Sequence, residues 1–172
     1  FAPRKAPARL MSFREKFKAL KALGIDRVLR IRFTETLRKM DADEFVDKVF
    51  VGGLGAKHII IGDDLRFGRD RGGNFELLKK IGLAQGFDVE ATETLTVGEE
   101  RASSTRIRAA LETTDFNLAN ELLGRPFSIS GKVMFGKQLG RQLDAPTANL
   151  ELHRLRSPLS GVFAVDAIMG EQ

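Results

Sequence analysis

The feature that most constrains the fold of this chain is the apolar run Ile59-Ile60-Ile61, which follows Lys57 and His58. The run lacks the polar alternation of a strand with one wet face, so it predicts a strand buried on both faces, as in a parallel sheet. Asn74 then caps a predicted helix that ends near residue 85, and a further strand is expected over 88–97. This alternation predicts a doubly wound α/β fold, in which ligands bind at the carboxyl ends of the strands.

Flanking segments extend the alternation of helices and strands. Predicted helices begin at residues whose side-chain oxygens can accept hydrogen bonds from the first turn, and predicted strands are rich in Val, Leu and Ile. The further elements expected before residue 125 are a helix from Ser12, with Glu15 completing a capping box, to Gly24; a strand over 26–33; a helix from Asp41, with Glu44 completing a second box, to Gly52; and a helix from Asp115 to Gly124.

The pattern changes after Gly124. Residues 127–135 alternate between apolar and polar side chains, which is typical of a half-buried strand, and 161–168 is a second strand candidate. We therefore predict two domains, residues 1–124 and residues 125–172, the second being the start of a β domain. Because the chain opens on Phe1 without Met and closes directly after a predicted strand, we expect a fragment of a longer protein.

Residues 101–108 carry three arginines and three hydroxyl side chains at a predicted helix start. Ser103 or Ser104 can serve as the N-cap, with Ile107 starting the buried face. Free backbone N–H groups, hydroxyls and guanidinium groups at this point would suit a polyphosphate. A capped helix with solvated arginines explains the same octet equally well.

Two loops are the other candidate sites. The loop over 62–73 leaves the predicted buried strand and is dense in glycine and charge, which suits a nucleotide, although a solvated loop is the alternative. The segment 136–150 holds glycine-spaced cations followed by Thr147 and Asn149, whose oxygens could hold a hard cation with phosphates. A plain β-hairpin loop is the alternative there.

Composition narrows the function classes. The net charge of +5 makes anionic partners plausible, but 23 acidic residues are interspersed among 28 basic ones, without the single-sign run of a nucleic-acid tail. Cysteine is absent, which excludes thiolate chemistry and permits a reducing compartment. No apolar run is long enough to span a bilayer, so we predict a cytoplasmic protein. His58 is interpreted as structural and His153 as exposed, which leaves no histidine metal site or catalytic triad.

Three stretches taken together resemble one family. These are Ile61-Gly62-Asp63-Asp64-Leu65-Arg66-Phe67-Gly68, the octet over 101–108, and the segment from Gly136 to Pro146-Thr147-Ala148-Asn149. In this order they resemble the bifunctional bacterial riboflavin kinase/FMN adenylyltransferases, or FAD synthetases. The resemblance covers nearly the whole chain.

The resemblance implies a Rossmann-like nucleotidyltransferase domain that joins AMP from ATP to FMN, giving FAD and pyrophosphate. It also implies a β-barrel that phosphorylates riboflavin with ATP and Mg²⁺. No nucleic acid and no membrane are expected as partners. The implied site residues are Gly62, Asp64, Arg101, Ser104, Thr105 and Arg108 for ATP at the first site; Phe67 for flavin; Gly136, Lys137, Gly140, Arg141 and Pro146 for ATP and flavin at the kinase site; and Thr147 and Asn149 for the metal.

Several family features lie outside this sequence or differ from it. The resemblance implies that the family's His-x-Gly-His pair falls before residue 1 and its kinase glutamate beyond residue 172. No catalytic residue is therefore assigned here, and we expect the fragment itself to be poorly active. Leu65 stands where an aromatic residue is commoner, and Asp144-Ala145 replaces Gly-Phe. Alternatives are an adenylyltransferase for another phosphorylated acceptor, which would need no kinase barrel, and a non-catalytic basic RNA-binding module.

Overall fold

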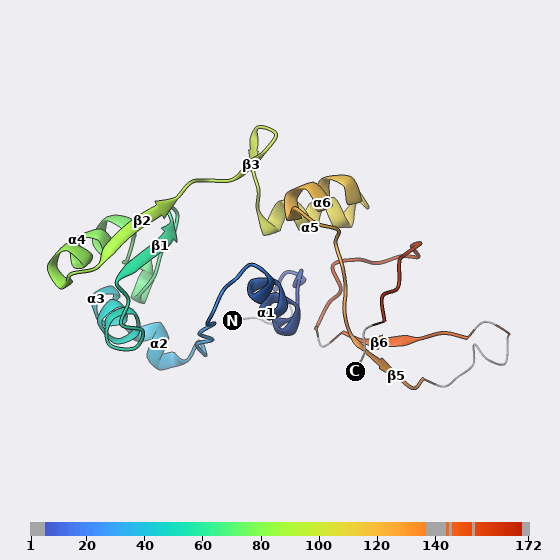
Figure 1. Ribbon diagram of the computed structural model, residues 1–172, viewed down its shortest axis with the longest axis horizontal. Coiled ribbons are helices and arrows are strands. Elements are labelled where there is room, and N and C mark those ends of the chain that lie inside the picture. Colours follow the sequence, from blue (N-terminus) through green and yellow to red (C-terminus); the bar gives the residue numbers. More distant parts are fainter. Residues whose placement is uncertain (1–5, 137–143, 145, 153, 170–172) are drawn as a thin grey trace. The chain divides into compact units, whose positions relative to one another are not determined.

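The computed structural model describes residues 6–136, 144, 146–152 and 154–169 (Figure 1). It divides into two compact units, one formed by residues 29–101 and the other by residues 1–28 together with 102–172. Both helices and strands occur, so the predicted α/β class is confirmed in its coarse form. The units do not coincide with the segments 1–124 and 125–172, and that division stays a prediction.

A parallel strand pair joined by a helix forms the centre of the unit 29–101. β1 (His58–Gly62) pairs in parallel with β2 (Asp88–Thr92), with Ile59 opposite Val89 and Gly62 opposite Thr92. Between them runs α4 (Phe75–Gln85), which lies alongside the pair in Figure 1. Its N-cap is Asn74, as predicted, and the Asn74 side chain accepts from the Leu77 N–H at 2.9 Å.

The core of this unit lies against one face of β1. Its buried members are Ala42, Val46, Ile59, Phe67, Leu78, Ile81 and Phe87. Within β1, Ile59 is 8% exposed, whereas Ile60 is 57% exposed. The prediction that this strand is buried on both faces is therefore wrong. Successive strand side chains point to opposite faces, and only one face of β1 is covered in the described structure.

Several short elements complete the same unit. They are α2 (Glu35–Lys39), α3 (Ala42–Phe45), the π-helical η2 (Val46–Val51), the 3₁₀ turn η3 (Arg69–Arg71), and the hairpin strands β3 (Thr96–Val97) and β4 (Glu100–Arg101). The predicted strand over 88–97 is thus split between β2 and β3. The capping box at Asp41 is also wrong in part, because the Asp41 side chain makes no cap hydrogen bond. Its carboxylate instead pairs with Arg69 at 2.8 Å.

The described residues of the second unit form three helices. α1 (Phe13–Ala22) has the predicted capping box between Ser12 and Glu15. α5 (Ser104–Glu112) is capped by Ser103, and α6 (Phe116–Leu123) is capped by Asp115 and followed by left-handed Gly124, as predicted. Their buried side chains are Ile107, Ala110 and Leu111 of α5 and Ala119 and Leu122 of α6. The helical boundaries therefore follow the capping signals closely.

Strand content is lower than the sequence predicts. In the second unit, β5 (Lys132–Met134) pairs with antiparallel β6 (Asn149–Glu151), so only part of the C-terminal half of the predicted strand over 127–135 forms. Residues 26–33 and 161–168, all described, form no strand. A strand requires a ladder of hydrogen bonds to a neighbouring segment, and neither segment belongs to a described sheet. Within the described residues, no helix combines the length and apolar character that crossing a bilayer requires.

Candidate functional site

The loop after β1 brings two of the predicted ATP residues together. Asp64 follows the strand end at Gly62, and its Oδ2 lies 2.8 Å from Nη1 of Arg101, the last residue of β4. A Cβ on Gly62 would lie 3.1 Å from Asp64 Oδ1, so the strand end is closely approached by this carboxylate. The loop and the β3–β4 hairpin thus place an acceptor and a cation side by side.

The two charges shift each other's ionisation. A hydrogen bond from Arg101, and then its positive charge, lowers the pKa of Asp64 below its ordinary value. The same pairing raises the pKa of Arg101. Both side chains are more than half exposed, so the pair adds little to stability. The pair holds the Arg101 guanidinium beside the loop that follows β1.

The remaining ATP residues of the octet lie on α5 in the other unit. Ser103 is the N-cap, and its hydroxyl accepts from the Arg106 N–H at 3.2 Å. Ser104 and Thr105 begin the helix and are exposed. Arg108 donates from Nε to the Ala8 carbonyl at 2.6 Å and from Nη1 to the Ser104 carbonyl at 3.1 Å. In this conformation the Arg108 guanidinium is therefore hydrogen-bonded to two backbone carbonyls, while Ser104 and Thr105 are exposed.

Phe67, the predicted flavin contact, lies in the core of the unit 29–101 and is 9% exposed. Paired backbone hydrogen bonds with Gly73, at 3.1 and 2.8 Å, fold the loop back on itself. The Phe67 ring packs 5.8 Å from that of Phe45, and a Cβ on Gly73 would lie 2.5 Å from the Phe67 ring. The structure thus gives Phe67 a packing role, and its contact with flavin stays a prediction.

The β5–β6 hairpin carries the predicted kinase residues. A hollow of about 160 Å³ lies at one end of it, lined by Val133, Met134, Phe135, Gly136, Thr147, Ala148 and Asn149. Met134 is opposite Asn149 in the register, which fixes Asn149 at the strand end. Pro146 is exposed beside it. Lys137, Gly140 and Arg141 lie outside the described residues.

The donor chemistry of this hollow suits Mg²⁺. Thr147 and Asn149 offer a hydroxyl and an amide oxygen, the hard ligands that Mg²⁺ accepts alongside phosphate and water. A Cβ on Gly136 would run into the Asn149 carboxamide, so glycine at 136 is what leaves room for that side chain. Among the described residues, no group of three or more His, Cys, Asp or Glu side chains is arranged for a metal.

A second, larger hollow of about 370 Å³ lies in the other unit, lined by Glu35, Thr36, Lys39, Met40 and Glu44. Both of its carboxylates are engaged in helical ion pairs, Glu35 with Arg38 and Glu44 with Lys48, each at 2.6 Å. None of the predicted site residues lines it, so we assign it no role. Its size reflects the open surface beside α2.

The two histidines differ in what the structure describes. His58 Nε2 lies 3.2 Å from Glu90 Oε2 across the β1–β2 pair, and both side chains are exposed. This cross-strand contact agrees with a structural role for His58. His153 lies outside the described residues.

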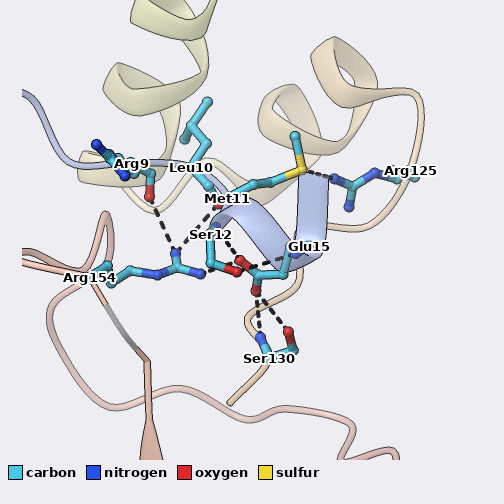
Figure 2. A network of polar contacts seen from close by, with 8 residues as sticks. All are labelled: Arg9, Leu10, Met11, Ser12, Glu15, Arg125, Ser130 and Arg154. Carbon is cyan, nitrogen blue, oxygen red and sulfur yellow. Dashed lines mark hydrogen bonds and ion pairs between the residues drawn. The ribbon is translucent and has the colours of Figure 1, made fainter. Parts of the chain in front are cut away.

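Sequence reasoning missed a polar network in the second unit, in which Glu15 contacts Ser130 and Arg154 (Figure 2). The sequence identifies Glu15 only as half of the capping box with Ser12. Nothing local to Glu15 indicates its partners, because they are contributed by segments far along the chain. The network becomes visible only in the folded structure.

The described structure is thus a mixed α/β chain that carries the Asp64–Arg101 pair at the end of β1 and, further along the sequence, the β5–β6 hairpin. Residues 1–106 match the family model described as FAD synthetase, and residues 123–172 match that described as riboflavin kinase. The first match spans more than half of the 172 residues. The chain belongs to the FAD synthetase family.

Individual relatives agree with this assignment. The chain is 50% identical over 165 residues to the bifunctional riboflavin kinase/FMN adenylyltransferase of Pseudomonas fluorescens, covering 96% of this chain and 53% of the relative. It is 45% identical over 173 residues to the Escherichia coli K12 protein of the same description, covering 100% and 55%. The chain thus spans about half the length of the curated relatives it matches.

One solved structure is also similar. It is described as a macrolide-efflux protein from Streptococcus pneumoniae, and it matches with 28% identity and a TM-score of 0.70. The match covers 88% of this chain and 51% of that one. The backbone of this chain therefore follows that of the solved structure over most of this chain's length.

Proposed function

We propose that this chain acts in FAD biosynthesis, with one site for adenylylation of FMN and another for phosphorylation of riboflavin. The observation that carries the proposal is the succession of the two family matches along a single chain, FAD synthetase over 1–106 and riboflavin kinase over 123–172. The relatives from Pseudomonas fluorescens and Escherichia coli, each described as bifunctional, support both activities.

At the first site, an FMN phosphate oxygen attacks the α-phosphorus of ATP, and pyrophosphate leaves. The role of this chain is to hold the nucleotide, because phosphate-group transfer depends mainly on positioning and electrostatics. Arg101, kept in place by Asp64 at 2.8 Å, would bind the polyphosphate. Gly62 gives the close approach at the strand end. Ser104 and Thr105 are proposed as further hydrogen-bond donors to the phosphates. Arg108 is proposed to turn from its backbone partners to the phosphates when the nucleotide binds, and Phe67 is proposed as the flavin contact.

The parallel β1–α4–β2 arrangement supports the proposal of a Rossmann-like fold for this part. A parallel pair with a crossover helix is the repeating unit of that fold. We propose likewise that β5 and β6 are the first strands of a kinase barrel. The predicted cytoplasmic location stays a prediction.

At the second site, the riboflavin 5′-hydroxyl oxygen attacks the γ-phosphorus of ATP, and ADP leaves with its β-phosphate oxygen. Thr147 and Asn149 would hold Mg²⁺ and orient the phosphates. When bound, Mg²⁺ neutralises charge on the phosphate oxygens. Gly136 keeps the space that Asn149 occupies, and Pro146, Lys137, Gly140 and Arg141 complete the proposed loop. The riboflavin kinase match over 123–172 favours this reading over an adenylyltransferase for another acceptor.

The test is titration of the full chain with FMN and with ATP·Mg²⁺, in the wild type and in Arg101→Ala and Thr147→Ala. We expect each variant to weaken one nucleotide site by about tenfold or more, the loss expected for a hydrogen bond to a charged group. Arg38→Ala is the matched control, since Arg38 also lies in an exposed ion pair, with Glu35, and is not one of the proposed site residues. Equal losses at both sites in either variant would refute the two-site assignment.

A further inference from the structure

The second unit contains a buried arginine, Arg154. The Arg154 side chain is 1% exposed, and its Nη2 donates to Glu15 Oε2 at 2.6 Å. Its Nη1 donates to the carbonyls of Arg9 and Leu10 at 3.3 and 3.4 Å (Figure 2). Within the described structure its Nε has no hydrogen-bond partner. A guanidinium removed from water in this way depends on its carboxylate, because an unpaired buried charge is costly.

Glu15 makes more contacts than a helix cap requires. Besides the reciprocal bonds with Ser12, its Oε1 accepts from the Ser130 N–H at 2.7 Å and from the Ser130 hydroxyl at 3.1 Å. Burial raises the pKa of Glu15, but hydrogen bonds from Ser12 and Ser130 and the charge of Arg154 outweigh it, leaving the pKa below its ordinary value. Glu15 is therefore ionised at neutral pH and satisfied by three separate segments.

The partners of Glu15 flank the β5–β6 hairpin at one end. Ser130 precedes β5 and Arg154 follows β6, and the register pairs Lys132 with Glu151 at that end. The other end of the hairpin has Met134 opposite Asn149 and carries the hollow described above. Glu15 thus joins the open end of a two-stranded hairpin whose far end holds Thr147 and Asn149. A two-stranded hairpin is marginal alone, so such a fastening affects its whole length.

We propose that Glu15 is a positioning residue for the nucleotide site of the β5–β6 hairpin, fastening both of its strands to the N-terminus of α1. This inference rests on the function proposed for that hairpin. Glu15 lies in the FAD synthetase match, whereas Ser130 and Arg154 lie in the riboflavin kinase match. The geometry of the kinase site therefore depends on a carboxylate contributed by the adenylyltransferase part of the chain.

The first test needs no ligand. Amide hydrogen exchange is measured at 130–134 and 149–151 in the full chain and in Glu15→Gln, which keeps the side-chain size and removes the charge. We expect exchange there to become about tenfold faster, the loss expected for a hydrogen bond to a charged group. Ser12→Ala is the matched control, because it removes the hydroxyl that accepts from the Glu15 N–H but leaves Ser130 and Arg154 paired with Glu15. Equal acceleration of the hairpin in both variants would overturn the proposal.

The second test measures ATP·Mg²⁺ affinity and separates this inference from the proposed function. The component of binding that Thr147→Ala removes should weaken about tenfold in Glu15→Gln, and the component that Arg101→Ala removes should stay unchanged. A wild type without any Thr147-dependent binding refutes the kinase site itself. Thr147-dependent binding that persists unaltered in Glu15→Gln refutes only the role of Glu15.

A milder variant guards against a general loss of folding. Ser130→Ala removes the hydroxyl contact of 3.1 Å while the Ser130 N–H still donates to Glu15. We expect it to shift hairpin exchange and Thr147-dependent binding in the same direction as Glu15→Gln, by a factor of about two to five. No shift of either quantity in either variant would overturn the proposal.

Discussion

Gly136 offers a direct test of the site at the β5–β6 hairpin. A Cβ at this position would penetrate the Asn149 carboxamide, and the Gly136 backbone is not in the left-handed region, so Gly136→Ala acts through that contact and not through strain. Ordinary contact begins at 3.4 Å, so Asn149 must move by about 1 Å or more. A misplacement of about 1 Å in a positioning group can cost about 100-fold in rate. Thr147-dependent affinity for ATP·Mg²⁺ should therefore fall at least tenfold.

The assay is calorimetric titration of Gly136→Ala with ATP·Mg²⁺, compared with Gly72→Ala. Gly72 also has an ordinary helical backbone, with φ −66°, but a Cβ there would meet its nearest atom, the Arg69 carbonyl oxygen, at 3.4 Å. Both substitutions lower the conformational entropy of the unfolded chain, and this effect raises the free energy of unfolding by about 0.4–1 kcal/mol in each. Unchanged Thr147-dependent binding in Gly136→Ala would show that Asn149 does not hold the ligand.

Three further predictions concern stability. Leu78→Ala should lower the free energy of unfolding by about 2–5 kcal/mol, because Leu78 is 0% exposed. Leu83→Ala on the same helix should change it by less than about 0.5 kcal/mol, because Leu83 is 83% exposed. Denaturant titration measures both free energies, and similar losses would contradict the described packing. Ser103→Ala should lower the free energy of unfolding by about 1 kcal/mol through loss of the α5 N-cap. Ser103→Asp is the control that preserves a cap, and equal thermal midpoints for the two variants would count against a capping role. The folded-state pKa of Glu15 lies below its ordinary 4.5, so its contribution to the free energy of unfolding is complete above that value and is lost as pH falls through the folded pKa. Between about pH 5 and pH 3 the thermal midpoint should therefore fall further for the wild type than for Glu15→Gln. Parallel pH profiles of the two proteins would argue against an ionised Glu15 in the network.

Local signals in the sequence predicted most of the helices, although not α2, which Thr34 caps. The N-caps Ser12, Asn74, Ser103 and Asp115 all act as predicted, and each accepts from a backbone N–H three residues further on. Asp41 is the exception, because Arg69, which is distant in the sequence, pairs with its carboxylate. A cap depends on residues within one turn, so it is readable from sequence unless a tertiary contact takes its side chain.

The sequence predicts site residues Asp64, Arg101, Thr147 and Asn149, and the structure places them in loops and at element ends. Their roles in binding ligands stay predictions. The sequence could not show that Asp64 and Arg101 pair, because contact between them depends on how β1 and the β3–β4 hairpin are arranged. For Phe67, too, the sequence could not show which groups its side chain contacts. Its residue type suits flavin stacking, but the bridge to Gly73 turns its ring into the core.

Strand pairing and burial were decided by the tertiary structure. A strand exists only where a second segment supplies hydrogen bonds, so Val- and Ile-rich residues at 26–33 and 161–168 do not suffice, and Ile60 is exposed despite its apolar neighbours. The linkage of Glu15 to Ser130 and Arg154 joins residues more than a hundred positions apart. The sequence by itself therefore determined the helices, their caps and the family motifs, whose causes are local. Which strands pair, which faces are buried and which charges meet depended on contacts that only the folded chain creates.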